Sequence, residues 1–317
     1  MKQPNRIKIL FLLFVFTGLG AALVLFKNTD FGKSDSSSLK VAIDSSSLQK
    51  VTLRYDSLTT VLTKGNQNWM LNGKYKARTN LTQLMILGLS KAEVKRPVAE
   101  ENKQKVADQL RKSGIRVTAE GDGWKKTFLL SSNDNDANSS YYMDEQSSEP
   151  YVIYVPGFSG DMANLFKMDE AGWRNRELFT STPLSLQKIT VSYPAFKASN
   201  VEIRWNPDKT FDVVGVKKVD SAKVITYLSQ FDQVNIDHYI YKDKVAILQT
   251  LRKNAPQAII EVSDLDPSAN HKLSVYGESK EPKGIYAIIE PGDELVTMKP
   301  ETLFRLLVRK EFFEKKK

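Results

Sequence analysis

A polar stretch that begins at Asp134, DNDANSSYYMDE, comes nearest in this sequence to a metal site. Counted as a twelve-residue calcium loop, it places Asp134, Asp136 and Asn138 at positions 1, 3 and 5, and Glu145 at position 12. These positions supply oxygen ligands in calcium loops, but position 6 is glycine there and is Ser139 here. The flanks alternate like strands. The pattern favours a solvated hairpin loop, with a calcium site as the alternative.

Residue types that do catalysis are present but do not form a recognisable set. The two histidines, His238 and His271, match no metal-ligand spacing. GFSGD at Gly157 resembles a nucleophile elbow, yet Asp161 occupies the position where the elbow has its second glycine. The absence of cysteine excludes disulfides and zinc–thiolate sites. We therefore predict a protein that is not an enzyme and needs no cofactor, and a hydrolase with an unrecognised site remains an alternative.

The elements that would position any site occur twice. SLQKVTLRY, which starts at Ser47, returns as SLQKITVSY at Ser185, and LRKSG, YVIYVPG and RELF return in the same order as LRKNA, IYAIIEPG and KEFF. In both copies, short strands are followed by two helices and then by further strands and a last helix. The sequence predicts an α+β fold, a tandem duplication of a mainly antiparallel β-sheet module with two or three helices on one face. The modules are assigned to residues 40–183 and 184–314.

The joint between the two modules carries the most distinctive side chains. Trp173, Arg174 and Arg176 combine a large ring with two cations. This combination suits an inter-module clasp, with Trp173 buried between the modules and one arginine paired with a carboxylate or a stacked ring. A point of partner docking is the alternative interpretation.

The N-terminus predicts membrane attachment. Residues 9–26 contain no charged side chain and follow Lys2, Arg6 and Lys8. About 20 apolar residues cross a bilayer, so this run is sufficient for one span. A cleaved signal peptide is the alternative, although no small-residue exit precedes the next charge. We expect residues 1–27 to form a cytoplasmic tip and a transmembrane signal anchor in the bacterial inner membrane, residues 28–39 to form a tether, and the bulk to be periplasmic.

The net charge of +9 does not predict nucleic-acid binding. Three of these charges come from residues 2, 6 and 8, and three more from residues 315–317. Nucleic-acid binders gather basic and aromatic side chains on one folded face. The excess charge lies instead at the two ends of the chain, so we expect no nucleic-acid partner.

Four segments together resemble a known family. PYVIYVPGFSG and WRNRELF, with VAIDSSSLQKVTL and WMLNGKYKAR, resemble the Bacteroidetes branch of domain-of-unknown-function family 4340. The resemblance covers most of residues 41–179 and the second module more loosely. It implies a single-pass, membrane-anchored protein facing the periplasm, often encoded beside ABC-type transporter components related to gliding motility. It implies no catalytic residues.

These observations favour a non-enzymatic accessory or scaffold protein that binds a membrane transport complex of the ABC type or a gliding-motility-like complex. The contact would use exposed sheet edges or the groove between the modules. An envelope glycan or peptidoglycan binder is the alternative, because aromatic residues are plentiful and could form a sugar platform on one face.

Overall fold

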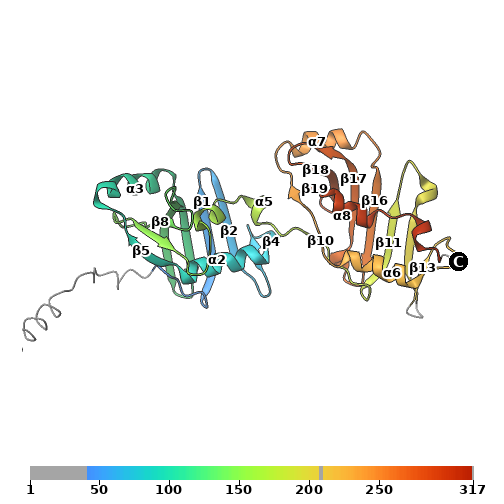
Figure 1. Ribbon diagram of the computed structural model, residues 1–317, viewed down its shortest axis with the longest axis horizontal. Helices are drawn as coiled ribbons and strands as arrows, with labels where there is room; N and C mark the ends of the chain where they lie inside the picture. The colour runs from blue at the N-terminus through green and yellow to red at the C-terminus, as the bar shows by residue number, and fades with distance from the viewer. Residues whose placement is uncertain (1–40, 207–209, 316–317) are drawn as a thin grey trace, which may run out of the picture.

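The computed structural model describes residues 41–206 and 210–315, which fold into two units lying side by side (Figure 1). Both units are α+β and built on antiparallel sheets, as the sequence predicts. The expected membrane anchor and tether, residues 1–39, lie outside the described residues. Among the residues that are described, no helix is long and apolar enough to cross a membrane.

The first unit runs from β1 to α5. Its elements are β1 (Leu48–Tyr55), β2 (Leu58–Lys64), β3 (Trp69–Leu71), β4 (Tyr75–Lys76), α2 (Thr79–Lys91), β5 (Glu93–Pro97), α3 (Glu100–Ser113), β6 (Ile115–Gly121), β7 (Trp124–Ser132), β8 (Ser140–Asp144), β9 (Tyr151–Tyr154), α4 (Met162–Phe166) and α5 (Glu170–Trp173).

The second unit runs from β10 to η4. Its elements are β10 (Glu177–Phe179), β11 (Leu186–Ser192), η1 (Lys197–Ser199), β12 (Val201–Trp205), β13 (Phe211–Val213), α6 (Ser221–Leu228), η2 (Ser229–Phe231), β14 (Val234–Asn235), β15 (His238–Tyr239), α7 (Lys244–Leu251), β16 (Ala258–Asp264), η3 (Pro267–Ala269), β17 (His271–Ser279), β18 (Gly284–Glu290), β19 (Glu294–Met298), α8 (Pro300–Leu306) and η4 (Lys310–Phe313).

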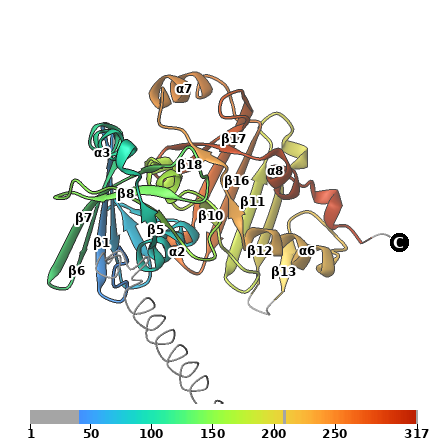
Figure 2. The ribbon, with the colours of Figure 1, turned by 60° about the vertical axis from the view of Figure 1, so that its left-hand side comes forward.

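The two large sheets have the same strand order. The first is β4-β3-β2-β1-β6-β7-β8-β9-β5, and the second is β13-β12-β11-β16-β17-β18-β19-β15. The orders coincide when β1 is matched to β11, β6 to β16 and β5 to β15, and β4 alone lacks a counterpart. Helices α3 and α7 occupy equivalent places at the same end of their sheets (Figure 2).

The repeated SLQK motif is explained by a β-bulge. The register between β1 and β6 shifts between Leu48 and Lys50, and that between β11 and β16 shifts at the equivalent Leu186 and Lys188. A bulge adds one residue to a strand, which changes the parity of the side chains after it. Leu48 and Val51 are therefore both buried although they are three positions apart. Because the bulge is the same in both units, both sheets begin with the same geometry.

Helices cover both faces of each sheet, which corrects the expectation of one covered face. On β7, Phe128 and Leu130 pack with α2 and α4, whereas Leu129 packs with α3 on the opposite face. The second unit likewise has a large core and a smaller one, in which Leu248 of α7 packs with Leu295 of β19. Consecutive apolar residues on a central strand are buried on both faces because helices pack from either side.

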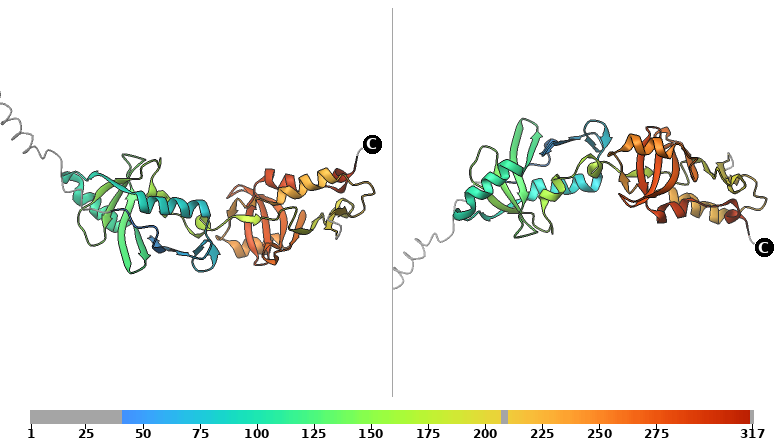
Figure 3. Two further views of the ribbon diagram at one scale, coloured as in Figure 1. Left: turned by 90° about the horizontal axis from the view of Figure 1, so that it is seen from below. Right: turned by 90° about the horizontal axis from the view of Figure 1, so that it is seen from above.

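The two units form an elongated body when seen from above or below (Figure 3). Each has a hydrophobic core of its own, so the joint between them is not a shared core. The position of each unit relative to the other therefore depends on the contacts at the joint. Inside the first unit, α2 and α4 approach closely at Gly88, where a side chain would collide with Met162.

Candidate functional site

The chain passes from one core to the other within a few residues. Trp173 is fully buried in the core of the first unit, and Phe179 is fully buried in the core of the second. The Arg78 backbone N–H donates to the Trp173 carbonyl (2.9 Å), and the Ile236 N–H donates to the Arg176 carbonyl (2.9 Å). The boundary therefore lies at Arg174–Arg176, earlier than the predicted division after residue 183, because β10 pairs with β14 of the second unit.

Arg174 links the two units through its side chain. Its guanidinium lies between the rings of Tyr75 in the first unit and Tyr239 in the second, 3.7 and 3.9 Å from their centroids. It donates to the Glu294 carboxylate (3.0 Å) and to the Tyr241 hydroxyl (3.1 Å). The side chain is only 10% exposed, so water screens these contacts little. We call these five residues the clasp.

Further contacts hold the clasp in place. Lys244 at the start of α7 pairs with the second oxygen of Glu294 (3.3 Å), and the Tyr239 hydroxyl donates to the Asn175 carbonyl (2.8 Å). At its edge, Lys76 of the first unit pairs with Glu177 of the second (3.0 Å). The carboxylate of Glu294 thus has two cationic partners, and the Tyr239 ring is anchored by its hydroxyl.

The clasp is charged at neutral pH. Burial on its own lowers the pKa of the Arg174 guanidinium, but the hydrogen bonds to Glu294 and Tyr241 outweigh burial and raise it. Burial alone would raise the pKa of Glu294, whereas the hydrogen bond and charge of Arg174, with Lys244, hold it below its usual value. Burial raises the pKa of Tyr241 to about 12. Arg174 and Glu294 therefore form an ion pair beside neutral tyrosines.

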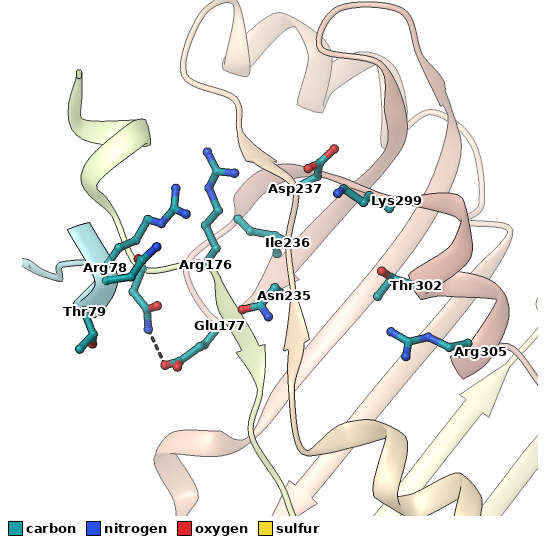
Figure 4. A pocket seen from close by; sticks show the side chains of 12 residues that line it. Arg78, Thr79, Arg176, Glu177, Asn235, Ile236, Asp237, Lys299, Thr302 and Arg305 are labelled. Carbon is teal, nitrogen blue, oxygen red and sulfur yellow. Dashed lines mark hydrogen bonds between the residues drawn. The ribbon is translucent and has the colours of Figure 1, made fainter. Parts of the chain in front are cut away.

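Two cavities open on the joint. One, of about 600 Å³, is lined by clasp residues and by His271. The other, of about 530 Å³, is lined by Arg78 and Arg176 on one side and by Lys299 and Arg305 on the other (Figure 4). In the close-up the Arg78 and Arg176 side chains lie next to each other. The second cavity, which we call the cationic cavity, takes its lining from both units.

The three residues singled out at the joint have different places. Trp173 lies inside the first core rather than between the units, because its side chain is fully buried in the hydrophobic cluster that contains residues of β3 and α2. Arg174 makes the clasp. Arg176 lies outside the clasp and lines the cationic cavity. The aromatic and acidic partners of Arg174 were missed because they come from segments far apart in the sequence.

The structure does not bring the four residues of the calcium hypothesis together. Asp136 pairs with Lys95 (2.9 Å), which lowers the pKa of Asp136 to about 2. Glu145 pairs with Arg116. Asp134 precedes β8 and Glu145 follows it, so about five residues of extended chain lie between the two carboxylates. In the described part of the chain, no group of three or more acidic, histidine or cysteine side chains could hold a metal ion. The segment is a β-hairpin loop.

The two histidines lie in the second unit, and His271 lines the cavity of about 600 Å³ beside the clasp. His238 on β15 is near Asp237 (3.5 Å), and His271 on β17 has its pKa lowered by burial. Asp161 of GFSGD accepts the Ala163 N–H (2.8 Å) and so caps α4. This segment therefore starts a short helix, and its aspartate has a structural contact.

Comparison with known proteins gives one match. No match was found among curated proteins or among solved structures. Residues 69–257 match the family described as Domain of unknown function (DUF4340). The match begins at β3 and ends just before β16. It includes Tyr75, Arg174 and Tyr239 of the clasp, whereas Glu294 lies beyond its end. The chain belongs to the DUF4340 family of domains of unknown function.

Proposed function

We propose that the protein is a non-enzymatic, membrane-anchored accessory protein whose two units form one binding body for a protein partner. The partner that the sequence favours is a membrane transport complex of the ABC type or a gliding-motility-like complex. The single observation that carries the proposal is the clasp. A buried arginine held by two rings, a carboxylate and a hydroxyl fixes the angle between two units that have separate cores.

A fixed angle matters to a binding protein because a partner can contact both units at once. If the units moved freely, binding to both would require ordering them, which reduces affinity. A buried ion pair adds little net stability compared with apolar packing but requires one arrangement of its groups. The clasp is therefore better suited to orienting the units than to holding each one folded.

The proposal includes an internal duplication and a membrane location. The shared strand order and the shared bulge support a module copied once and fused. The uncharged run at residues 9–26 supports a single inner-membrane anchor, with the bulk of the chain periplasmic. On this proposal the tether of residues 28–39 keeps the binding body close to the membrane and its complex.

The glycan alternative draws no specific support from the joint. A sugar platform needs exposed aromatic faces, but the faces of Tyr75 and Tyr239 that meet at the joint are occupied by the Arg174 guanidinium. Trp173 is fully buried in the first core. We therefore keep the protein-binding function as the proposal.

The proposal is tested by crosslinking in membranes, solubilisation in detergent and affinity purification of the full chain. We expect components of a transport or motility complex to be recovered with the wild-type protein and to be depleted with Arg174→Ala. Arg54→Gln, an exposed change on β1, is the matched control and leaves recovery unchanged. Recovery of the chain alone, in repeated crosslinked samples, would overturn the proposal.

A further inference from the structure

Two helices begin after aspartates at the positions where the cationic cavity has cations. Asp161 caps α4, and Asp220 caps α6 by accepting the Lys223 N–H (3.2 Å). The equivalent positions at the cavity are Arg78 before α2 and Lys299 before α8, and neither side chain caps its helix. Aspartate satisfies free N–H groups at a helix start, whereas a cation there opposes the helix dipole. The fold does not require cations at these positions.

The cations of the cavity also form no ion pairs within the described part of the chain. Among the residues that the structure describes, no carboxylate lies within ion-pair distance of Arg78, Arg176, Lys299 or Arg305. Two carboxylates line the cavity. Glu177 is held by Lys76 and by the Asn175 amide (2.6 Å), and Asp237 lies 3.5 Å from His238. The four cations therefore outnumber the carboxylates of the lining, and none of them is paired with one.

The arginine pair shows the effect of this imbalance. The Arg176 Nε–H is buried and has no hydrogen-bond partner. Burial lowers the pKa of the Arg78 guanidinium, and the nearby charge of Arg176 lowers it further. Repulsion between two like charges is unfavourable, and so is a buried donor without an acceptor. A bound anion would balance the charges and accept a hydrogen bond from the donor.

We infer that the cationic cavity binds a small ligand through a phosphate group, which Arg78 and Arg176 hold from one side while Lys299 and Arg305 face it from the other. Guanidinium forks match phosphate oxygens in pairs. A phosphate monoester carries about −1.5 to −2 charges, as an excess of cations demands. A volume of about 530 Å³ suits a small molecule.

The ligand site is independent of the partner-binding proposal. It needs no second protein, and its residues are separate from the five clasp residues. Because its lining comes from both units, a ligand there would also contact both sides of the joint (Figure 4). A failure of the partner experiment leaves the ligand site intact, and a failure to bind phosphate leaves the clasp intact.

The test is isothermal titration of the full chain in detergent with inorganic pyrophosphate, at constant ionic strength set with sodium chloride. We expect saturable binding that weakens about tenfold or more in Arg176→Gln and in Arg78→Gln, since each removes a charge-assisted contact. Citrate is titrated in parallel to separate phosphate from carboxylate recognition. Arg54→Gln, which removes an exposed arginine of β1, should bind as the wild type does.

Thermal unfolding of the same variants separates ligand binding from folding. Without ligand, Arg176→Gln should melt at or above the wild-type temperature, because it removes like-charge repulsion and an unpaired donor. Equal pyrophosphate binding by wild type and Arg176→Gln, or no binding by either, would overturn the inference. Tighter binding of citrate than of pyrophosphate would overturn the phosphate assignment. A lower melting temperature for Arg176→Gln would show a structural role and contradict the inference too.

Discussion

The ends of the two units have the same backbone but different side chains. Arg174 forms an isolated bridge with Ala77, just as Glu314 forms one with Val219. In each case the preceding residue, Trp173 or Phe313, is a fully buried aromatic residue. Its carbonyl accepts an N–H from the residue before a helix, at 2.9 Å in both units. The fold of a unit thus depends on the ring, while the residue after it is free to differ.

That difference separates folding from coupling. The Arg174 side chain reaches the second unit and forms the clasp, whereas the Glu314 side chain is exposed. The same backbone position therefore holds a connecting side chain at the joint and a solvated one at the far end. Substitutions at the ring should damage one unit, and substitutions one residue later should affect only the relation between units.

The largest effect is expected from Trp173→Ala. Removing a fully buried indole leaves a cavity and should cost the first unit about 3–5 kcal/mol of unfolding free energy. Phe313→Ala should cost the second unit a similar amount. Chemical denaturation followed by hydrogen exchange reports which unit opens. If either variant opened both units equally, the separation of folding from coupling would be wrong.

A smaller effect, of a different kind, is expected from Arg174→Ala. Loss of the guanidinium leaves Glu294 buried with Lys244 as its remaining partner, at a cost of about 3 kcal/mol to the joint. Each unit should keep its own stability, because neither core is touched. Glu314→Ala, the matched change at the other end, should alter stability by less than about 0.5 kcal/mol.

The readout for Arg174→Ala is the distance between spin labels on the two units. The chain has no cysteine, so Lys112→Cys and Lys253→Cys, both exposed, give one label per unit. A narrow distance distribution in the wild type should broaden in Arg174→Ala and stay narrow in Glu314→Ala. An unchanged distribution in Arg174→Ala would show that the clasp does not fix the angle.

Acid should release the same joint. The folded-state pKa of Glu294 is below its ordinary value of 4.5, since Arg174 and Lys244 outweigh the effect of burial. Its contribution to stability is therefore fully present above pH 4.5 and is lost as the pH falls through the lowered value. Glu294→Gln should broaden the distribution of distances between the two spin labels at neutral pH. In acid, the distributions of Glu294→Gln and of the wild type should become the same. A difference independent of pH would exclude the ion pair as its cause.

Much of the fold could be predicted from local patterns, and the exceptions have physical reasons. The sequence predicted short strands followed by two helices, and in the first unit α2 and α3 follow the first strands. The consecutive run Phe128, Leu129, Leu130 has no single face, so it could not reveal that helices cover both sides of β7. The early end of the first unit was hidden because Phe179 belongs to a core made mostly by later residues.

The joint was predictable only in outline. A ring and two cations in WRNR indicated a contact between units, but which cation makes it depends on tertiary placement. Arg174 meets Tyr75 and Glu294 because β4 and the start of β19 face each other across the joint. No spacing in the sequence connects these positions.

The smallest expected effect concerns a second difference between the units, the residue that precedes the equivalent helices α2 and α6. Arg78→Asp would give α2 the residue that Asp220 supplies to α6, and both positions have extended backbone before the helix. The new carboxylate should accept a first-turn N–H, complement the helix dipole and relieve repulsion from Arg176. The free energy of unfolding should rise by about 1 kcal/mol, measured by denaturation without ligand. Asp220→Arg should lower the stability of the second unit by a similar amount. If Arg78→Asp destabilised the chain, Arg78 would have a structural role and its cation would not be there to bind a ligand.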